Sequence, residues 1–337
     1  MDNVLILNLY DRKDKFFFYL CGEIGPEKVW LHLIYTQNMA NSSAARFLSR
    51  CRRFPLTLVL LVPTGMGRKG GAGCTYCNNQ TFNPAYCRTE KSVAEQLEEG
   101  KRFFARKYPD MRYLSYFQAY TNTYGELDDM MRKYEEALAV PGVVGIVIGT
   151  RPDCMPQPLL DCLAGLARRV FVMVEYGIES ADDSTLARIN RGHTFAETEE
   201  AVRRTAAAGI PVGGHVILGL PGEGHDALML QAAKLSALPL TALKIHQLQL
   251  IRGTRMAREY VERPEEFHLY AVDEYIDLVI DYIERLRSDL YLERFVSQSP
   301  KELLIAPDWG LKNHEFTERL KRRMGERGTC QGRLAGR

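Results

Sequence analysis

The sequence predicts an α/β fold: a partial (β/α)6 barrel of the TIM type with a small C-terminal α/β appendage. From about residue 56 onward, short apolar runs rich in β-branched residues alternate with longer segments of helical period. This alternation is typical of repeated βα units around a parallel sheet. Six such units can be counted, fewer than a closed TIM barrel requires.

The six expected strands are short runs dominated by Leu, Val, Ile and aromatic residues, which favour a buried pleated sheet. They lie at residues 56–62, 113–117, 143–148, 170–175, 212–218 and 242–250. Apolar residues of helical period predict the intervening helices at residues 89–107, 126–138, 156–168, 196–208 and 225–236. Each helix returns the chain to the start of the next parallel strand.

The two ends of the chain have different patterns. Residues 259–337, which follow the barrel at 54–258, predict a long amphipathic helix over about 266–288, a strand-like piece around 290–296 and a basic helix over about 312–325. Residues 1–53 show no clear period, carry no chemistry-bearing motif and contain a plausible alternative start at Met39. We therefore treat this N-terminal segment as of doubtful nativeness.

The charge balance does not indicate a nucleic-acid protein. The formal net charge is only +2, and the one local bias is the tail at 311–337, with eight Lys or Arg against three Asp or Glu. This tail is either a solvated helix face or a contact for an RNA backbone.

The cysteines and the apolar runs indicate where the protein works. Its eight cysteines are scattered except for one close pair, which fits a reducing compartment better than a disulfide scaffold. The apolar runs fall short of a membrane helix, and the N-terminus lacks a signal-peptide layout. We expect a cytoplasmic protein with no membrane partner.

The close pair, Cys74 and Cys77, lies in the loop after the first predicted strand. Two thiolates separated by two residues can bind one metal centre, because a turn aims both sulfurs inward. Taken alone, the pair fits an iron–sulfur cluster, a zinc knuckle or a redox dithiol. Zinc would require a second pair at similar spacing, which the sequence lacks.

The loops after the other predicted strands carry unusual residues too, where chemistry collects in such barrels. With these motifs the sequence resembles the radical SAM (S-adenosylmethionine) proteins of the YhcC/YtqA type, which are related to the radical SAM subunit of Elongator. The motifs are Gly-Cys-Thr-Tyr-Cys-Asn at 73–78, Tyr-Phe-Gln-Ala-Tyr-Thr at 116–121, Gly-Thr-Arg-Pro-Asp-Cys at 149–154, Arg-Ile-Asn-Arg-Gly-His at 188–193 and Gly-Leu-Pro-Gly-Glu-Gly at 219–224.

The resemblance implies a [4Fe–4S] cluster held by three cysteines, whose open iron chelates SAM. An electron from the cluster would cleave SAM to methionine and a 5′-deoxyadenosyl radical that abstracts hydrogen from the substrate. Such a protein also needs a reductant such as flavodoxin or ferredoxin.

The resemblance also suggests residues that contact SAM. Glu179 and Arg191 occupy places that contact SAM in the superfamily, and Arg191 would pair with its carboxylate. His215 would face the ribose or be a satisfied core histidine. Gln118 and Tyr120 stand where many radical SAM enzymes fix the SAM amine.

The glycines of the fifth loop and the end of the sixth strand supply further candidates. Gly219 would let the backbone approach the adenine or ribose, although a tight βα turn also explains it. Lys244 and His246 end the sixth predicted strand and could meet the substrate.

The position of the expected third cluster ligand departs from the family. The family pattern there is Gly-Phe-Thr-Cys-Pro-Asn-Arg-Asp-Gly, and at its cysteine, twelve residues before Cys74, this chain has Val62. Codons for that pattern, read one base late, translate to Val-Leu-Leu-Val-Pro-Thr-Gly-Met-Gly, the sequence at 59–67. We therefore hypothesise a local frameshift. The alternative is a divergent protein in which Val62 is a core strand residue and Cys87 a substitute ligand.

Three functions remain open at this stage. The first is radical SAM chemistry on tRNA near a wobble uridine, because the relative in Elongator acts there and the tail is basic. The second is radical chemistry on a small metabolite. The third is a degenerate, non-catalytic protein in which Cys74 and Cys77 hold zinc or nothing, because the first cluster cysteine is replaced by Val62.

Overall fold

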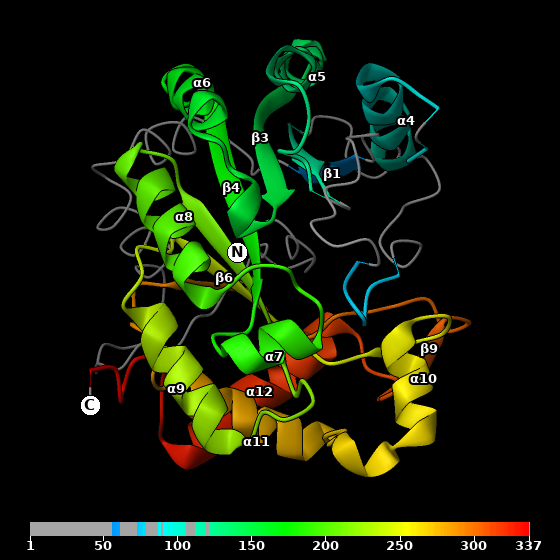
Figure 1. Ribbon diagram of the computed structural model, residues 1–337, viewed down its shortest axis with the longest axis vertical. Coiled ribbons are helices and arrows are strands. Elements are labelled where there is room, and N and C mark those ends of the chain that lie inside the picture. The colour runs from blue at the N-terminus through cyan, green and yellow to red at the C-terminus, as the bar shows by residue number, and fades with distance from the viewer. Residues whose placement is uncertain are drawn as a thin grey trace.

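The computed structural model describes residues 56–60, 73–78, 87–88, 90–105, 112–118 and 121–336. In this part of the chain, seven strands form one sheet in the order β1-β2-β3-β4-β5-β6-β8, and every neighbouring pair is parallel. The sheet curls into a half-barrel, as Figure 1 shows. The predicted α/β partial barrel is therefore confirmed.

The elements follow one another as strand and helix along the chain. The strands are β1 Leu56–Leu60, β2 Tyr113–Phe117, β3 Val143–Thr150, β4 Phe171–Glu179, β5 Val212–Leu218, β6 Ala242–Gln247, β7 Leu250–Ile251, β8 Tyr291–Arg294 and β9 Leu304–Ala306. The helices are α4 Val93–Ala105, α5 Leu127–Ala139, α6 Gln157–Ala167, α7 Asp183–Arg188, α8 Phe195–Ala207, α9 His225–Ser236, α10 Arg255–Glu262, α11 Val272–Ile283 and α12 Asn313–Arg327. Two short 3₁₀ turns are η2 Pro152–Cys154 and η3 Pro264–Glu266.

Some predicted elements differ from the structure. The third and fourth strands, expected at 143–148 and 170–175, extend to Thr150 and Glu179. The sixth strand, expected at 242–250, ends at Gln247, and β7 continues as a separate piece that pairs with β9. At the end of β6 the side chain of Gln247 bonds the backbone of Ser297 in both directions, donating to its carbonyl at 3.1 Å and accepting from its N–H at 2.7 Å. The long helix expected at 266–288 is the shorter α11, and the sequence did not predict α7 or α10.

The two faces of the sheet have different surroundings, because successive side chains of a strand point to opposite faces. Side chains such as Ile146, Val174 and Val216 face the helices and belong to the main core. The opposite, inner face carries a smaller apolar cluster toward the starts of the strands. The members of this cluster are Leu114, Tyr116, Val147, Phe171, Met173 and Ala242. Farther along the same face lie Glu175, His215 and Lys244, so this face becomes polar toward the carboxyl ends of the strands.

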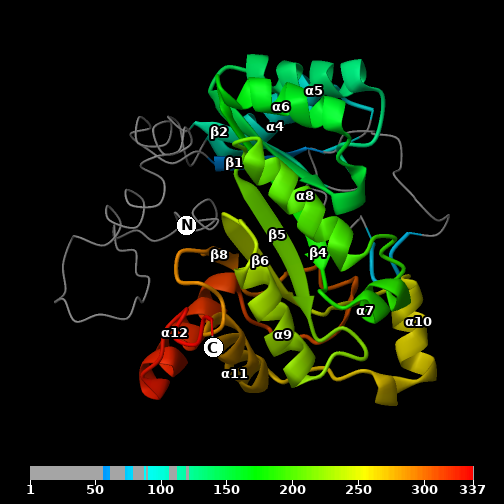
Figure 2. The ribbon, with the colours of Figure 1, turned by 60° about the vertical axis from the view of Figure 1, so that its left-hand side comes forward.

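The C-terminal region packs on the half-barrel. The strand-like piece predicted around 290–296 is β8, which pairs with β6 and extends the sheet. Helix α12 lies beside α11 (Figure 2) and buries Phe316 and Leu320 in the main core. Its Arg323 and Arg327 form ion pairs with Asp277 of α11 at 3.7 and 2.8 Å. The boundary at 258/259 stays a prediction, as does the assignment of 1–53, which lies outside the described residues.

Within the part of the chain that the structure describes, no helix is both long and apolar enough to cross a membrane.

Candidate cofactor site

The cysteine loop, residues 73–78, is held by the residues that follow α7 and by the start of α10, both distant from it in the sequence. The N–H of Thr75 donates to the carbonyl of Ile189 at 3.0 Å, and the N–H of Met256 donates to the carbonyl of Thr75 at 2.9 Å. The amide of Asn190 donates to the carbonyl of Gly73 at 2.7 Å. Because α7 follows the end of β4 (Figure 2), these bonds fix the loop at the carboxyl end of the half-barrel.

Arg191 is the centre of this site. Its Nη1 lies 3.4 Å from Sγ of Cys74, its Nη2 donates to the carbonyl of Gly177 at 2.6 Å, and the same nitrogen lies 3.5 Å from Glu179. Burial opposes the charged form, but the negative groups around it raise the pKa of Arg191. The guanidinium therefore stays protonated, between a cysteine and a carboxylate.

The end of β4 has the unusual backbone that this arrangement needs. Glu179 adopts a left-handed φ of 66°, and the pairing of β4 with β5 shifts between Gly177 and Glu179. A Cβ on Gly177 would lie 2.3 Å from Nη2 of Arg191 and 2.7 Å from the carboxylate of Glu179. The site therefore requires glycine at position 177, a signal that the sequence analysis missed.

His193 supports Arg191 from the other side. An arginine side chain can only donate, so Nε of Arg191 donates to Nε2 of His193 at 3.1 Å, and Nδ1–H of His193 donates to the carbonyl of Thr194 at 3.2 Å. This bonding assigns the neutral imidazole. Burial and the charge of Arg191 lower the pKa of His193 to about 4, in agreement with that assignment.

The inner face of the sheet below this site holds a polar network, of which the sequence analysis selected His215 and Lys244. Glu175 accepts from Tyr116 at 2.6 Å, from His215 at 2.9 Å and from Lys244 at 2.6 Å. Burial opposes ionisation, but Lys244 and His215 hold the pKa of Glu175 well below its usual range. Glu293 adds a second carboxylate 3.2 Å from Lys244.

Glu175 was missed by the sequence analysis, although a signal was present. It lies on the same face of β4 as Gly177, because side chains two residues apart share a face. A carboxylate inside a run of apolar strand residues indicates a buried partner. What could not be predicted is that the partner lies two strands away, on β6.

The other predicted site residues occupy different places. His215 bonds Glu175 on the inner face. Gly219 has a φ of 90°, and a Cβ there would meet the ring of Tyr270 at 3.1 Å, so a close approach does require glycine. Gln118 follows the end of β2. Tyr120 and Val62 lie outside the described residues.

His246 belongs to the same polar layer. Its ring stacks on that of His215 with centroids 5.7 Å apart, and its Nε2 accepts from Arg294 at 2.8 Å. Burial and the charge of Arg294 lower the pKa of His246 well below the usual value, so this imidazole is neutral.

The loop at 219–224 adds a buried carboxyl group. Glu223 accepts a hydrogen bond from the hydroxyl of Ser180, which follows β4, and its Oε2 is buried without a hydrogen-bond partner. Burial raises the pKa of Glu223 to about 7.

The donor set fits an iron–sulfur cluster only in part. Cys74 and Cys77 supply two thiols on a fixed loop. Among the described residues, no three His, Cys, Asp or Glu side chains gather closely enough to hold a metal ion. The position expected to supply the third sulfur is Val62, whose side chain cannot ligate iron.

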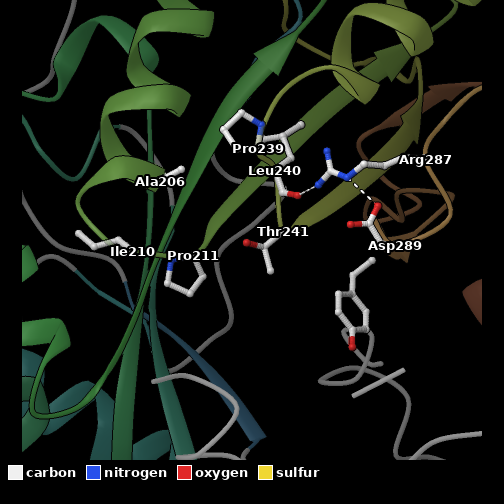
Figure 3. Close-up of a pocket in the computed structure, with 10 residues that line it drawn as sticks. Ala206, Ile210, Pro211, Pro239, Leu240, Thr241, Arg287 and Asp289 are labelled. Carbon is white, nitrogen blue, oxygen red and sulfur yellow. Dashed lines mark hydrogen bonds and ion pairs between the residues drawn. The ribbon is translucent and has the colours of Figure 1, made fainter. Parts of the chain in front are cut away.

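A separate pocket lies at the opposite edge of the sheet, where β5, β6 and β8 begin (Figure 3). It has a volume of about 310 Å³ and is lined in part by Pro211, Thr241 and Tyr291. Arg287 bonds the carbonyl of Leu240 and pairs with Asp289 at 2.8 Å (Figure 3). It also bonds the carbonyl of Leu238. The guanidinium of Arg287 is therefore already bonded to carbonyls and a carboxylate of this chain.

Fold and site together define a class: an α/β half-barrel protein with a cysteine pair and a buried arginine at the carboxyl ends of its strands. Residues 67–230 match the model of the radical SAM superfamily, and residues 240–326 match that of the radical SAM C-terminal domain.

Comparison with curated proteins and solved structures agrees. The chain is 34% identical to YtqA of Bacillus subtilis over 272 residues, which cover 81% of this chain and 84% of YtqA. It is 31% identical to YhcC of Escherichia coli over 276 residues, 82% and 87% of the two chains. The structure of the archaeal Methanocaldococcus infernus Elp3 superposes with a TM-score of 0.59 at 17% identity, over 71% of this chain and 59% of that one, a likeness of fold.

The chain therefore belongs to the radical SAM superfamily of enzymes, in the family that contains YtqA and YhcC. The family implies a [4Fe–4S] cluster and SAM.

Proposed function

We propose that this protein is a radical SAM enzyme that modifies tRNA, near a wobble uridine, with Cys74 and Cys77 as ligands of its cluster. The observation that carries the radical SAM site is the gathering of Cys74, Arg191 and Glu179 at the carboxyl end of the half-barrel. The chemistry that the cluster supplies when bound is the one-electron cleavage of SAM to methionine and a 5′-deoxyadenosyl radical.

The residues of this chain would bind and orient the cofactor. Arg191 is protonated and buried, which suits it to hold a carboxylate such as that of SAM. Glu179 lies beside it and can accept from an ammonium group. Gly219, with its left-handed backbone, would let the chain approach the ribose or adenine.

Three further residues complete the proposed contacts. His215 donates Nε2–H to Glu175, which leaves its Nδ1 as an acceptor for a ribose hydroxyl. Gln118 and Tyr120 would contact the SAM amine.

The cluster is tested by anaerobic reconstitution of the chain as it stands and of Val62→Cys. Iron and sulfide are measured per chain, and SAM cleavage is followed by the 5′-deoxyadenosine formed. We expect the unaltered chain to bind iron poorly and Val62→Cys to bind a full cluster, because thiolates hold such a cluster. A full cluster in the unaltered chain would contradict the frameshift hypothesis. A full cluster in Val62→Cys without SAM cleavage would contradict the enzymatic proposal.

The tRNA substrate is supported by the family relation to Elongator and by the basic tail. The ion pairs of Arg323 and Arg327 with α11 reduce the charge that this tail offers to a ligand. Arg319, Lys321 and Arg322 remain toward solvent on α12, with Lys321 and Arg322 also near glutamates of the same helix. We expect the tRNA partner to be in the cytoplasm, together with a reductant such as flavodoxin or ferredoxin.

The tRNA proposal is tested by electrophoretic shift of unfractionated tRNA at low and high salt. Removal of the tail is a poor test, because α12 buries Phe316 and Leu320 in the core. Changing Arg319, Lys321 and Arg322 together to serine keeps the helix. We expect a salt-sensitive shift that weakens in this variant. Absence of any shift at low salt would favour a small-metabolite substrate instead.

A further inference from the structure

A buried ion pair lies next to the site and contacts its 191–193 loop. Arg151 and Asp153 follow the end of β3, and their side chains are only 9% and 1% exposed. The pair is bidentate: Nε of Arg151 donates to Oδ1 of Asp153 at 2.9 Å, and Nη2 donates to Oδ2 at 2.8 Å. The planar guanidinium and the carboxylate thus fix each other's orientation.

The same arginine reaches the loop that carries Arg191. Nη2 of Arg151 also donates to the carbonyl of Gly192 at 3.1 Å. Gly192 has a left-handed φ of 78° and lies between Arg191 and His193 in the chain. Arg191, the residue before Gly192, directs its side chain to Gly177 and Cys74. His193, the residue after Gly192, accepts a hydrogen bond from Nε of Arg191.

Stability alone is a weak explanation for this pair. Two charges taken out of water lose solvation that their mutual attraction often only balances, so apolar replacements of such pairs are frequently neutral. The geometry has another use, because a carbonyl held by a rigid fork fixes the backbone from which Arg191 and His193 extend.

We propose that Arg151 and Asp153 are positioning residues that hold the Gly192 carbonyl and thereby keep the Arg191 guanidinium against Cys74 and Gly177. The position of Arg191 does not depend on the function proposed above, whereas its use for a SAM carboxylate rests on that function. The two are therefore tested by separate measurements.

The test is hydrogen exchange of the Arg191 Nε–H, followed by NMR of protein labelled with 15N-arginine. The signal is assigned by its loss in Arg191→Lys. In the unaltered protein this hydrogen is bonded to His193 in a buried site, so we expect slow exchange. The variant Arg151→Met/Asp153→Leu removes both charges together and fills the same space. We expect its Arg191 Nε–H to exchange faster by about tenfold or more.

A control makes the same chemical change nearby. Arg188 of α7 pairs with Glu266 of η3, and this pair does not bond the 191–193 loop. Arg188→Met/Glu266→Leu is expected to leave the exchange of Arg191 Nε–H unchanged. Urea unfolding of all variants separates a local effect from a general loss of stability.

A second variant protects the test against poor folding. Asp153→Asn keeps the shape of the side chain but removes one charge, and we expect a smaller, measurable acceleration. Unchanged exchange in a folded Arg151→Met/Asp153→Leu or, if that variant does not fold, in Asp153→Asn would overturn the proposal. If reconstituted Val62→Cys protein fails to bind SAM in equilibrium dialysis, the proposed function fails while the exchange result still decides the role of Arg151 and Asp153.

Discussion

The ammonium group of Lys244 lies 2.7 and 2.6 Å from the two carboxylate oxygens of Glu175, on strands β6 and β4 with β5 between them. Both side chains are at least nine-tenths buried, and Nζ of Lys244 also lies 4.7 Å from the centre of the Tyr116 ring. The inner face of the half-barrel therefore carries a buried ion pair toward the carboxyl ends of its strands.

Removal of Lys244 should be strongly destabilising. Lys244→Met leaves the buried Glu175 carboxylate without its cation, and we expect the free energy of unfolding to fall by about 3 kcal/mol or more. Urea denaturation measures it. As a control, Lys321→Met breaks an exposed pair with Glu318 and should change stability by less than about 0.5 kcal/mol. Equal effects of the two changes would contradict the assignment of a tightly paired Glu175.

A side chain at position 177 should disturb the site more than the fold. In Gly177→Ala the added Cβ meets Arg191 and Glu179, so we expect their pairing to break and SAM affinity to fall by about tenfold. Gly165→Ala is the matched control, because nothing lies within 4 Å of a Cβ there and alanine favours helix α6. It should stabilise the protein by about 0.5–1 kcal/mol. Isothermal titration with SAM of reconstituted protein that also carries Val62→Cys, together with thermal unfolding, would show whether the two glycines differ.

Asn190 should matter both for its backbone and for its amide. It has a left-handed φ of 54° and donates to the carbonyl of Gly73. Asn190→Gly keeps the backbone and loses one hydrogen bond, at a cost of about 1 kcal/mol. Asn190→Ala adds the strain of a left-handed residue, about 1 kcal/mol more. Iron release to a chelator from protein that also carries Val62→Cys should accelerate in both variants. If alanine is tolerated as well as glycine, the left-handed backbone is not required.

Acid should destabilise the protein through His193. Its pKa is about 4 in the folded state, whereas an unfolded histidine titrates near ~6.5. Between these values the unfolded state binds more protons, so the free energy of unfolding falls as the pH drops from ~6.5 to ~4, by at most about 3 kcal/mol. Urea titrations at several pH values measure this slope. His193→Gln should reduce the slope and leave the part that the buried His246 contributes, and substitution of the exposed His314 should leave the slope unchanged.

The fold was predictable because its signal is local. Strands β2 and β5 have the predicted bounds, and the helices between the strands lie within a few residues of the expected ranges. The elements missed, α7 and α10, are short, and a few turns carry too little periodicity to be recognised.

Site residues that belong to a sequence motif could be predicted. Site residues that are defined only by a contact in the folded structure could not. Cys74 and Arg191 were both selected, and the structure brings them within 3.4 Å of each other. The partnership of Glu175 with Lys244, and that of Arg151 with Gly192, joins elements that have no fixed spacing in the sequence.

By itself, therefore, the sequence determined the class of fold, the family and the cysteine pair, because hydrophobic period and short motifs are written in neighbouring residues. Only the tertiary structure decided what surrounds that pair. The curl of the sheet decides which buried charged side chains lie close together. A charge removed from water is stable only where an opposite charge lies within contact distance. Arg191 is placed by Gly177 and His193, and through Gly192 by Arg151, contacts that exist only once the strands are side by side.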